Sequence, residues 1–145
     1  MLNLFTAFGY FEDEVDDRAV LARIARALAP GGAFLVDVVS LFGIVREFQP
    51  RSWADVGEGW TMLDEREYDV LTGRSAATWT FLGPNGERRE LRHSVRLYTL
   101  PELRGMLAEA GLDVEAAWLN WDGEEYRFAG RGRLIVSARK RLTPA

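Results

Sequence analysis

The chain has 145 residues, of which 48% are hydrophobic and 28% charged, as in an ordinary globular domain with a hydrophobic core. Its net charge of −4 argues against a nucleic-acid partner, and the absence of cysteine together with a single histidine, His93, argues against a metal site. No apolar run reaches the roughly 20 residues that span a bilayer, and the N-terminus has no signal-peptide pattern. We therefore expect no membrane partner and a cytoplasmic location.

A strand–helix–strand core followed by a connector is predicted for residues 1–57. Residues 2–8 are apolar at nearly every position, which is typical of a strand buried on both faces of a parallel sheet. The acidic run 12–17 favours a helix N-terminus, and Pro30-Gly31-Gly32 ends this helix before a second apolar strand at Ala33–Val39. Strand, helix and strand in this succession indicate a right-handed parallel crossover.

An antiparallel insert of three strands is predicted for residues 58–98. Residues 41–53, which precede it, fit a short helix followed by a loop. Strand-like runs then cover residues 60–68, 74–82 and 88–98. The dipeptide Asn85-Gly86, which favours a tight hairpin turn, separates the last two runs. Successive strands joined by short turns indicate an antiparallel meander.

A final helix and two closing strands are predicted for the last part of the chain, residues 99–145. Thr99 and Glu102 form a capping-box pattern at the start of the helix. Strands at 112–119 and 133–139 follow, joined by a polar loop rich in acidic and aromatic residues. The whole chain is expected to form a single domain with four core strands and the insert.

Four segments of the sequence carry a resemblance to a known family. They are Asn3-Leu-Phe-Thr-Ala-Phe-Gly-Tyr-Phe11, Ala27-Leu-Ala-Pro-Gly-Gly-Ala-Phe-Leu-Val-Asp37, Tyr98-Thr-Leu-Pro-Glu-Leu103 and Arg133-Leu-Ile-Val-Ser-Ala-Arg-Lys140. In this order they resemble the fourth and fifth strands, the last helix and the closing strand of class I S-adenosylmethionine-dependent methyltransferases that act on small molecules. The resemblance covers nearly the whole chain, but only the C-terminal half of the family's fold. It implies an α/β fold: a truncated Rossmann-like methyltransferase sheet with an inserted three-stranded antiparallel meander.

The family's cofactor-binding half has no counterpart in this sequence. The family grips S-adenosylmethionine with a glycine-rich loop after its first strand, and an acidic residue after its second strand takes the ribose hydroxyls. The glycine-rich stretches here, at 30–32, 57–59 and 130–132, do not lie between a buried strand and a following helix. Losing two charge-assisted hydrogen bonds to the ribose costs about 3–6 kcal/mol, or roughly a hundred- to ten-thousand-fold in affinity. The implied cofactor is S-adenosylmethionine, which the chain alone is expected to bind very weakly.

The resemblance also implies candidate site residues. Those matching the end of the family's fourth strand face the cofactor: Asn3, Phe5 and Gly9. Those expected on the substrate side are Tyr10, Phe11, Arg96, Trp121 and Tyr126. For most of them, strand packing or a solvated surface is the better interpretation, while for Tyr10 function and packing fit equally well, and the catalytic residue stays unknown. His93 better fits a half-buried structural histidine than a general base, and Asp37 could orient a substrate or bond to backbone.

Two functions fit these observations. The first is a small-molecule methyltransferase whose cofactor-binding segment comes from upstream or from another chain. The alternative is a non-catalytic, methyltransferase-derived binding or scaffold domain that works as a homodimer. The strand at 2–8 would lack its neighbour, and its apolar edge has no lysine or proline to block pairing. We therefore expect a homodimer formed through residues 2–8 or through swapped elements.

Overall fold

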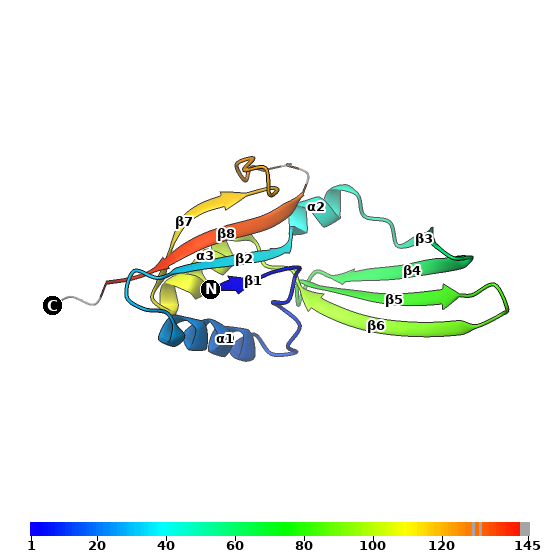
Figure 1. Ribbon diagram of the computed structural model, residues 1–145, viewed down its shortest axis with the longest axis horizontal. Coiled ribbons are helices and arrows are strands. Elements are labelled where there is room, and N and C mark those ends of the chain that lie inside the picture. The colour runs from blue at the N-terminus through cyan, green and yellow to red at the C-terminus, as the bar shows by residue number, and fades with distance from the viewer. Residues whose placement is uncertain (129, 131, 143–145) are drawn as a thin grey trace. The chain divides into compact units, whose positions relative to one another are not determined.

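The computed structural model describes residues 1–128, 130 and 132–142 (Figure 1). The chain divides into two compact units. Unit 1 joins the N-terminal segment Met1–Arg46 to the C-terminal segment Leu97–Ala145, and unit 2 is the intervening segment Glu47–Arg96. The insert thus begins about ten residues earlier than its expected range of 58–98.

Unit 1 contains a four-stranded sheet in the order β1-β2-β8-β7, which confirms the four expected core strands. Its strands are β1 (Leu2–Asn3), β2 (Ala33–Val39), β7 (Leu112–Trp118) and β8 (Arg133–Lys140). Strand β1 is parallel to β2, whereas β8 runs antiparallel to both β2 and β7. The β1–α1–β2 segment is therefore the predicted parallel crossover, with α1 (Glu14–Ala27) as its helix.

Both long helices begin at a residue whose side chain caps the helix. Asp13 accepts a hydrogen bond from the Val15 amide (2.9 Å) at the start of α1. Thr99 and Glu102 form the predicted capping box at the start of α3 (Leu100–Glu109). A short helix, α2 (Leu41–Arg46), follows β2. Each cap satisfies amide groups that the first helical turn leaves without partners.

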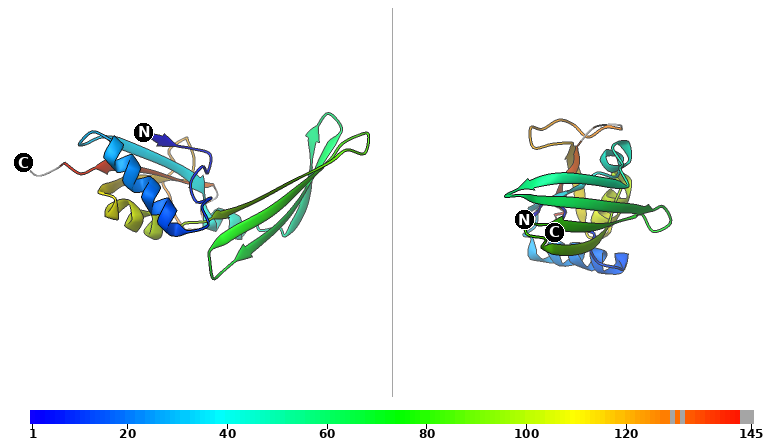
Figure 2. Two further views of the ribbon diagram at one scale, coloured as in Figure 1. Left: turned by 90° about the horizontal axis from the view of Figure 1, so that it is seen from below. Right: turned by 90° about the vertical axis from the view of Figure 1, so that its right-hand side faces the viewer.

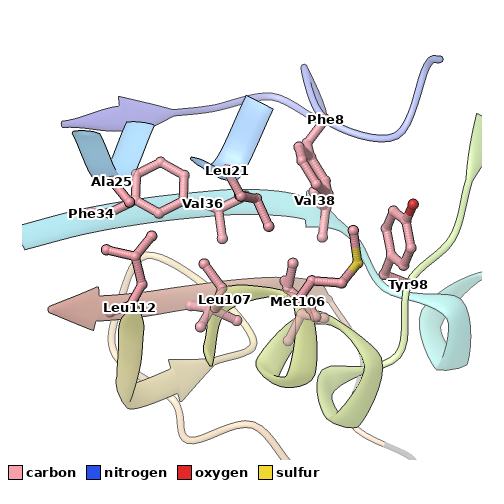
Figure 3. Packing of buried hydrophobic residues seen from close by; sticks show 14 residues of the cluster. Phe8, Leu21, Ala25, Phe34, Val36, Val38, Tyr98, Met106, Leu107 and Leu112 are labelled. Atoms are coloured by element: carbon pink, nitrogen blue, oxygen red, sulfur yellow. The ribbon is translucent and has the colours of Figure 1, made fainter. Parts of the chain in front are cut away.

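The core of unit 1 lies between its sheet and the two long helices (Figure 3). Phe34 and Val36 of β2 pack against Leu21 of α1 and Leu107 of α3, and all four side chains are at most 1% exposed. Alternate residues of the strands thus face the helices, while the residues between them face the opposite side. Burying apolar side chains of this size stabilises the fold by about 1.5–3 kcal/mol each.

The expected buried strand at 2–8 is wrong beyond Asn3. Leu2 is 66% exposed and Phe5 81% exposed, and only Phe8 at the end of the run enters the core. Phe5 and Thr6 both have φ of 57°, a left-handed conformation that no strand accommodates. The chain therefore turns after Asn3 and returns to the core at Phe8, whose ring lies 5.5 Å from that of Tyr98.

Unit 2 is an antiparallel sheet of four strands in sequence order, one more than the sequence predicts. The strands are β3 (Arg51–Gly57), β4 (Trp60–Asp69), β5 (Arg74–Leu82) and β6 (Arg88–Arg96), seen in two directions in Figure 2. The additional strand is β3, which was expected to be part of a loop. It is largely exposed and polar, and it pairs with β4 from Arg51↔Glu65 to Gly57↔Trp60. Its strand conformation comes from this pairing and not from an apolar face of its own.

Throughout the described ranges, no helix is both long and apolar enough to cross a membrane.

Candidate functional site

The candidate site lies in unit 1, where β1 ends and β2 approaches its carboxyl end. Ligands of open α/β sheets bind outside the carboxyl ends of parallel strands, and β1 and β2 are such a pair. The loop that follows β1 carries the two residues with left-handed conformation, Phe5 and Thr6, and then Gly9 with φ of 96°. The sequence-predicted cofactor residues Asn3, Phe5 and Gly9 thus follow one another along this edge.

A buried carboxylate organises the loop. Asp37 of β2 is fully buried, and one of its oxygens accepts a hydrogen bond from the Phe5 amide (3.0 Å). The other oxygen accepts from Nε of Arg133, the first residue of β8. Arg133 also donates through Nη2 to Thr6 Oγ1 (2.7 Å). One carboxylate and one guanidinium therefore join three segments that lie far apart in the sequence.

Thr6 closes this network through the backbone. Its amide donates to the Asp37 carbonyl oxygen (2.9 Å), and its hydroxyl accepts from the Val39 amide (3.0 Å). A left-handed conformation costs a non-glycine residue roughly 1–2 kcal/mol, and such residues persist where surrounding contacts over-determine them. The bonds of Asp37, Thr6 and Arg133 supply those contacts, so the turn at Phe5–Thr6 is held rigidly in a position that the sheet architecture associates with ligands.

Tyr126 of the final loop reaches the same end of β2. Its hydroxyl lies 3.2 Å from Oγ of Ser40, a fully buried residue directly after β2. The Tyr126 amide donates to the Ala117 carbonyl oxygen (2.9 Å), which fixes the loop against β7. Tyr126 also lines an open hollow of about 470 Å³, together with Arg104 and Glu125. Of the predicted substrate residues, this one has the most definite setting.

Asn3 carries an unsatisfied group. Its Oδ1 is shielded from solvent and has no hydrogen-bond partner within the described residues. Buried polar atoms in native proteins are nearly always bonded, so an unbonded one indicates where a further group belongs. Asn3 lies in β1, the edge strand of its sheet.

The other predicted substrate residues lie on different segments of the chain. Tyr10, Phe11 and Trp121 are between 49% and 56% exposed, the first two before α1 and the third in the loop after β7. Arg96 ends β6 in unit 2, where its Nη1 contacts the carbonyl oxygen of Gly73 (3.4 Å) in the β4–β5 turn. The roles of these residues stay predictions.

His93 is placed in β6 as expected, half-buried, with its ring 4.5 Å from the ring of Trp79. Burial lowers the pKa of His93, and the positive charge of Arg66 lowers it further, while Asp64 opposes the shift. In the part of the chain that the structure describes, no group of three or more histidine, aspartate or glutamate side chains could hold a metal ion.

The residues present do not fit a complete S-adenosylmethionine site. The β1–α1 loop contains the single glycine Gly9, and most other glycines with positive φ lie in turns of unit 2 or at strand and helix ends. No described segment places a glycine-rich turn between a buried strand and a helix, which close approach to a nucleotide requires. No step of a reaction can therefore be derived through the cofactor here.

Sequence reasoning missed Arg133, the partner of Asp37. A signal was present, because Asp37 is a single charge in the otherwise apolar strand Ala33–Val39, and a buried carboxylate needs a cation or several donors. Several arginines could have filled this role. The register of β2 and β8 brings Arg133 to Asp37. Arg133 lies opposite Val39, and Asp37 is two residues from Val39, so its side chain points to the same face of the sheet.

Comparison with solved structures shows which fold this is. The chain superposes on the CcbJ methyltransferase from Streptomyces caelestis with a TM-score of 0.84 at 18% identity, over 96% of this chain and 59% of that one. For an S-adenosylmethionine-dependent methyltransferase from Clostridium acetobutylicum the TM-score is 0.81 at 13% identity, over 97% and 57%. This is a methyltransferase fold. The expected α/β architecture with an antiparallel insert is thereby confirmed.

A third similar structure is CalS10 from Micromonospora echinaspora, an amino pentose methyltransferase with bound cofactor, at a TM-score of 0.67 and 21% identity. The chain covers 56% of its length, so it spans less than two thirds of each of these proteins. No protein-family model matches the sequence. No curated protein matches it either.

Proposed function

We propose that this chain is the substrate-side part of an S-adenosylmethionine-dependent methyltransferase acting on a small molecule, and that it requires a separate cofactor-binding segment. The observation that carries the proposal is the fit of 96% of the chain to 59% of the CcbJ methyltransferase. The missing glycine-rich turn explains why the chain would be incompetent alone.

In this proposal, unit 1 contributes a rigid wall to the reaction site. The turn at Phe5 and Thr6, held by Asp37 and Arg133, borders the methyl donor, and Tyr126 borders the acceptor. Methyl transfer by this fold needs alignment of donor and acceptor more than a dedicated base, and alignment alone can supply several kcal/mol of the barrier. The geometry of the wall is then the chain's contribution to catalysis.

Calorimetry with S-adenosylmethionine tests the cofactor part of the proposal. The chain alone should show no saturable binding up to about 1 mM, because the ribose contacts and the glycine-rich turn are missing. A dissociation constant of about 10 μM or tighter, near −7 kcal/mol, would contradict it. S-adenosylhomocysteine serves as the matched control ligand, since it lacks only the methyl group and its charge.

The reading frame upstream of Met1 tests the enzymatic part. A strand, a Gly-x-Gly-x-Gly turn and a helix encoded there would predict that the longer chain binds the cofactor at micromolar concentration and transfers its methyl group. The matched control is the longer chain with the middle glycine of that turn changed to valine, which should lose binding. A longer chain that folds and yet binds no cofactor would contradict the proposal.

The homodimeric scaffold remains a second candidate because β1 lies at an open sheet edge. Leu2 and Phe5 are mostly exposed there, and an unblocked edge can pair with a second copy. Sedimentation at micromolar concentration should then show a dimer that Leu2→Lys and Phe5→Asp dissociate. Val70→Asp, at an equally exposed position of unit 2, is the control. A monomer in the unsubstituted chain would contradict this candidate.

A further inference from the structure

One face of the unit 2 sheet carries a compact polar cluster, formed by Asp64, Arg66, Trp79 and His93. Asp64 and Arg66 are two residues apart in β4, so their side chains emerge on the same face. Trp79 of β5 lies directly opposite Asp64, while Ala77 lies between Arg66 and His93 of β6. The register of three adjacent strands thus gathers these four side chains.

The cluster contains two buried polar atoms without partners. Asp64 is 6% exposed, and its Oδ2 accepts from Arg66 Nη2 (2.5 Å), but its Oδ1 has no hydrogen-bond partner within the described ranges. The same holds for the indole Nε1 of Trp79. One atom is an acceptor and the other a donor, and they belong to directly paired residues, whose Cβ atoms lie about 5 Å apart.

A single chemical group can satisfy both atoms if it donates and accepts. A hydroxyl does so, donating to Asp64 Oδ1 and accepting from Trp79 Nε1. An ammonium group does not, because it has donors only. Arg66 already balances the charge of Asp64, and burial lowers the pKa of His93, which disfavours its charged form. The cluster is therefore suited to an uncharged group.

We propose that this cluster binds one hydroxyl of a neutral polyhydroxylated small molecule, between Asp64 and Trp79. The two atoms are shielded, so the ligand approaches past the cluster's more exposed members, Arg66 and His93. Arg66, whose side chain is 27% exposed, forms an ion pair with Asp64, and in this proposal its guanidinium has to move to admit the ligand. The inference concerns unit 2 alone and does not depend on methyl transfer.

The indole N–H signal of Trp79 in a ¹H–¹⁵N spectrum of the full chain reports directly on this site. Methyl glucoside is the probe, and tetrahydropyran, the same ring without hydroxyls, is the matched control. We expect methyl glucoside to shift the Trp79 signal saturably in the millimolar range, and tetrahydropyran to leave it unchanged. The signals of the exposed Trp53 and Trp121 should not move with either compound and so report nonspecific effects.

Two variants test the assignment. Asp64→Asn should weaken the dissociation constant of methyl glucoside about tenfold, because a charge-assisted hydrogen bond is lost. Glu65→Gln, the adjacent residue on the opposite face, should leave it unchanged. If Asp64→Asn disturbs folding, saturation-transfer measurements on Trp79→Phe, which keeps an aromatic ring, should show the same loss. An unshifted Trp79 signal at 100 mM methyl glucoside, or equal shifts of all indole signals, would mean that a water fills the gap and would overturn the proposal.

Discussion

The two units of this protein use strands in opposite ways. Unit 1 covers one face of its sheet with two long helices, and fourteen buried residues form one continuous core around Phe34, Val36 and Leu107. Unit 2 is a single sheet in which, among the described residues, Ala77 and Val95 are the buried apolar side chains. Its strands are held by backbone ladders and cross-strand pairs such as Trp53 opposite Leu63.

The difference shows where substitutions can be tolerated. In unit 1 the buried core residues pack against side chains from the sheet and both long helices, so removing one leaves a cavity. In unit 2 many apolar side chains are partly in water, so removal costs mainly the lost contact area. The buried polar network at Asp37 belongs to the first environment, and the exposed ion pairs of both units belong to the second.

The sharpest test of this contrast is one chemical change in both units. Leu107→Ala in the core of unit 1 should lower the free energy of unfolding by about 2–5 kcal/mol, because the side chain is fully buried. Leu91→Ala in β6, where the side chain is 51% exposed, should cost well under half as much. Urea denaturation followed by tryptophan fluorescence measures both. Equal losses of stability for the two variants would show that Leu91 is buried in the protein in solution, contrary to its exposure in this structure.

Next in size is the loss of the buried carboxylate at the candidate site. Asp37→Asn should destabilise unit 1 by about 1.5–3 kcal/mol, because the Phe5 amide and Arg133 lose a charged acceptor. Asp113→Asn, in an exposed pair with Arg141, is the matched control and should leave the unfolding midpoint unchanged. A neutral effect of Asp37→Asn would indicate that the Phe5–Thr6 turn does not need this network.

A smaller effect is expected at the cap of α3. Thr99→Ala removes the hydroxyl that accepts from the Glu102 amide and should cost about 1 kcal/mol. Thr99→Ser keeps the hydroxyl and should retain most of the stability. Thermal unfolding followed by circular dichroism distinguishes the two variants. Identical midpoints for Ala and Ser would show that the strands around α3 fix its start without the cap.

The smallest effect concerns the pH dependence of unit 2. Burial and the charge of Arg66 lower the pKa of His93 below its usual 6.5, so the unfolded chain takes up a proton at higher pH than the folded one. Above pH 6.5 the titration of His93 therefore does not reduce the free energy of unfolding. As the pH falls below 6.5, the unfolded chain is stabilised by protonation of His93, and the free energy of unfolding decreases. Because His93 is the single histidine, its ring-proton shifts give the pKa directly. The urea midpoint of His93→Gln should fall less between pH 7.5 and 5.5 than that of the unsubstituted chain, and a pKa above 6.5 would reverse the sign.

Local signals in the sequence were sufficient for most elements. The capping box at Thr99, the stop at Pro30-Gly31-Gly32 and the turn at Asn85-Gly86 act over a few residues, and the structure places helix and strand ends there. The apolar run at Ala33–Val39 is a strand with the predicted bounds. Such features depend on interactions between near neighbours, which the sequence displays directly.

The sequence failed where distant partners override local preference. Residues 2–8 read as a strand because they are apolar, but the side chain of Asp37 captures the Phe5 amide and turns the chain. Strand β3 was not predicted because its sequence shows no clear strand pattern, but its pairing with β4 makes it extended. A hydrogen-bond partner on a distant segment produces no periodic pattern in the sequence of residues 2–8 or of β3.

By itself, the sequence determined the class of fold, the order of its elements and the absence of a glycine-rich nucleotide loop, since these follow from composition, periodicity and short motifs. Tertiary structure alone decided that Arg133 joins Asp37 across 96 residues, and that Asp64 and Trp79, each with an unsatisfied atom, are paired across neighbouring strands. Strand register determines both of these pairings. Register is fixed by the packing of whole elements and not by any single residue.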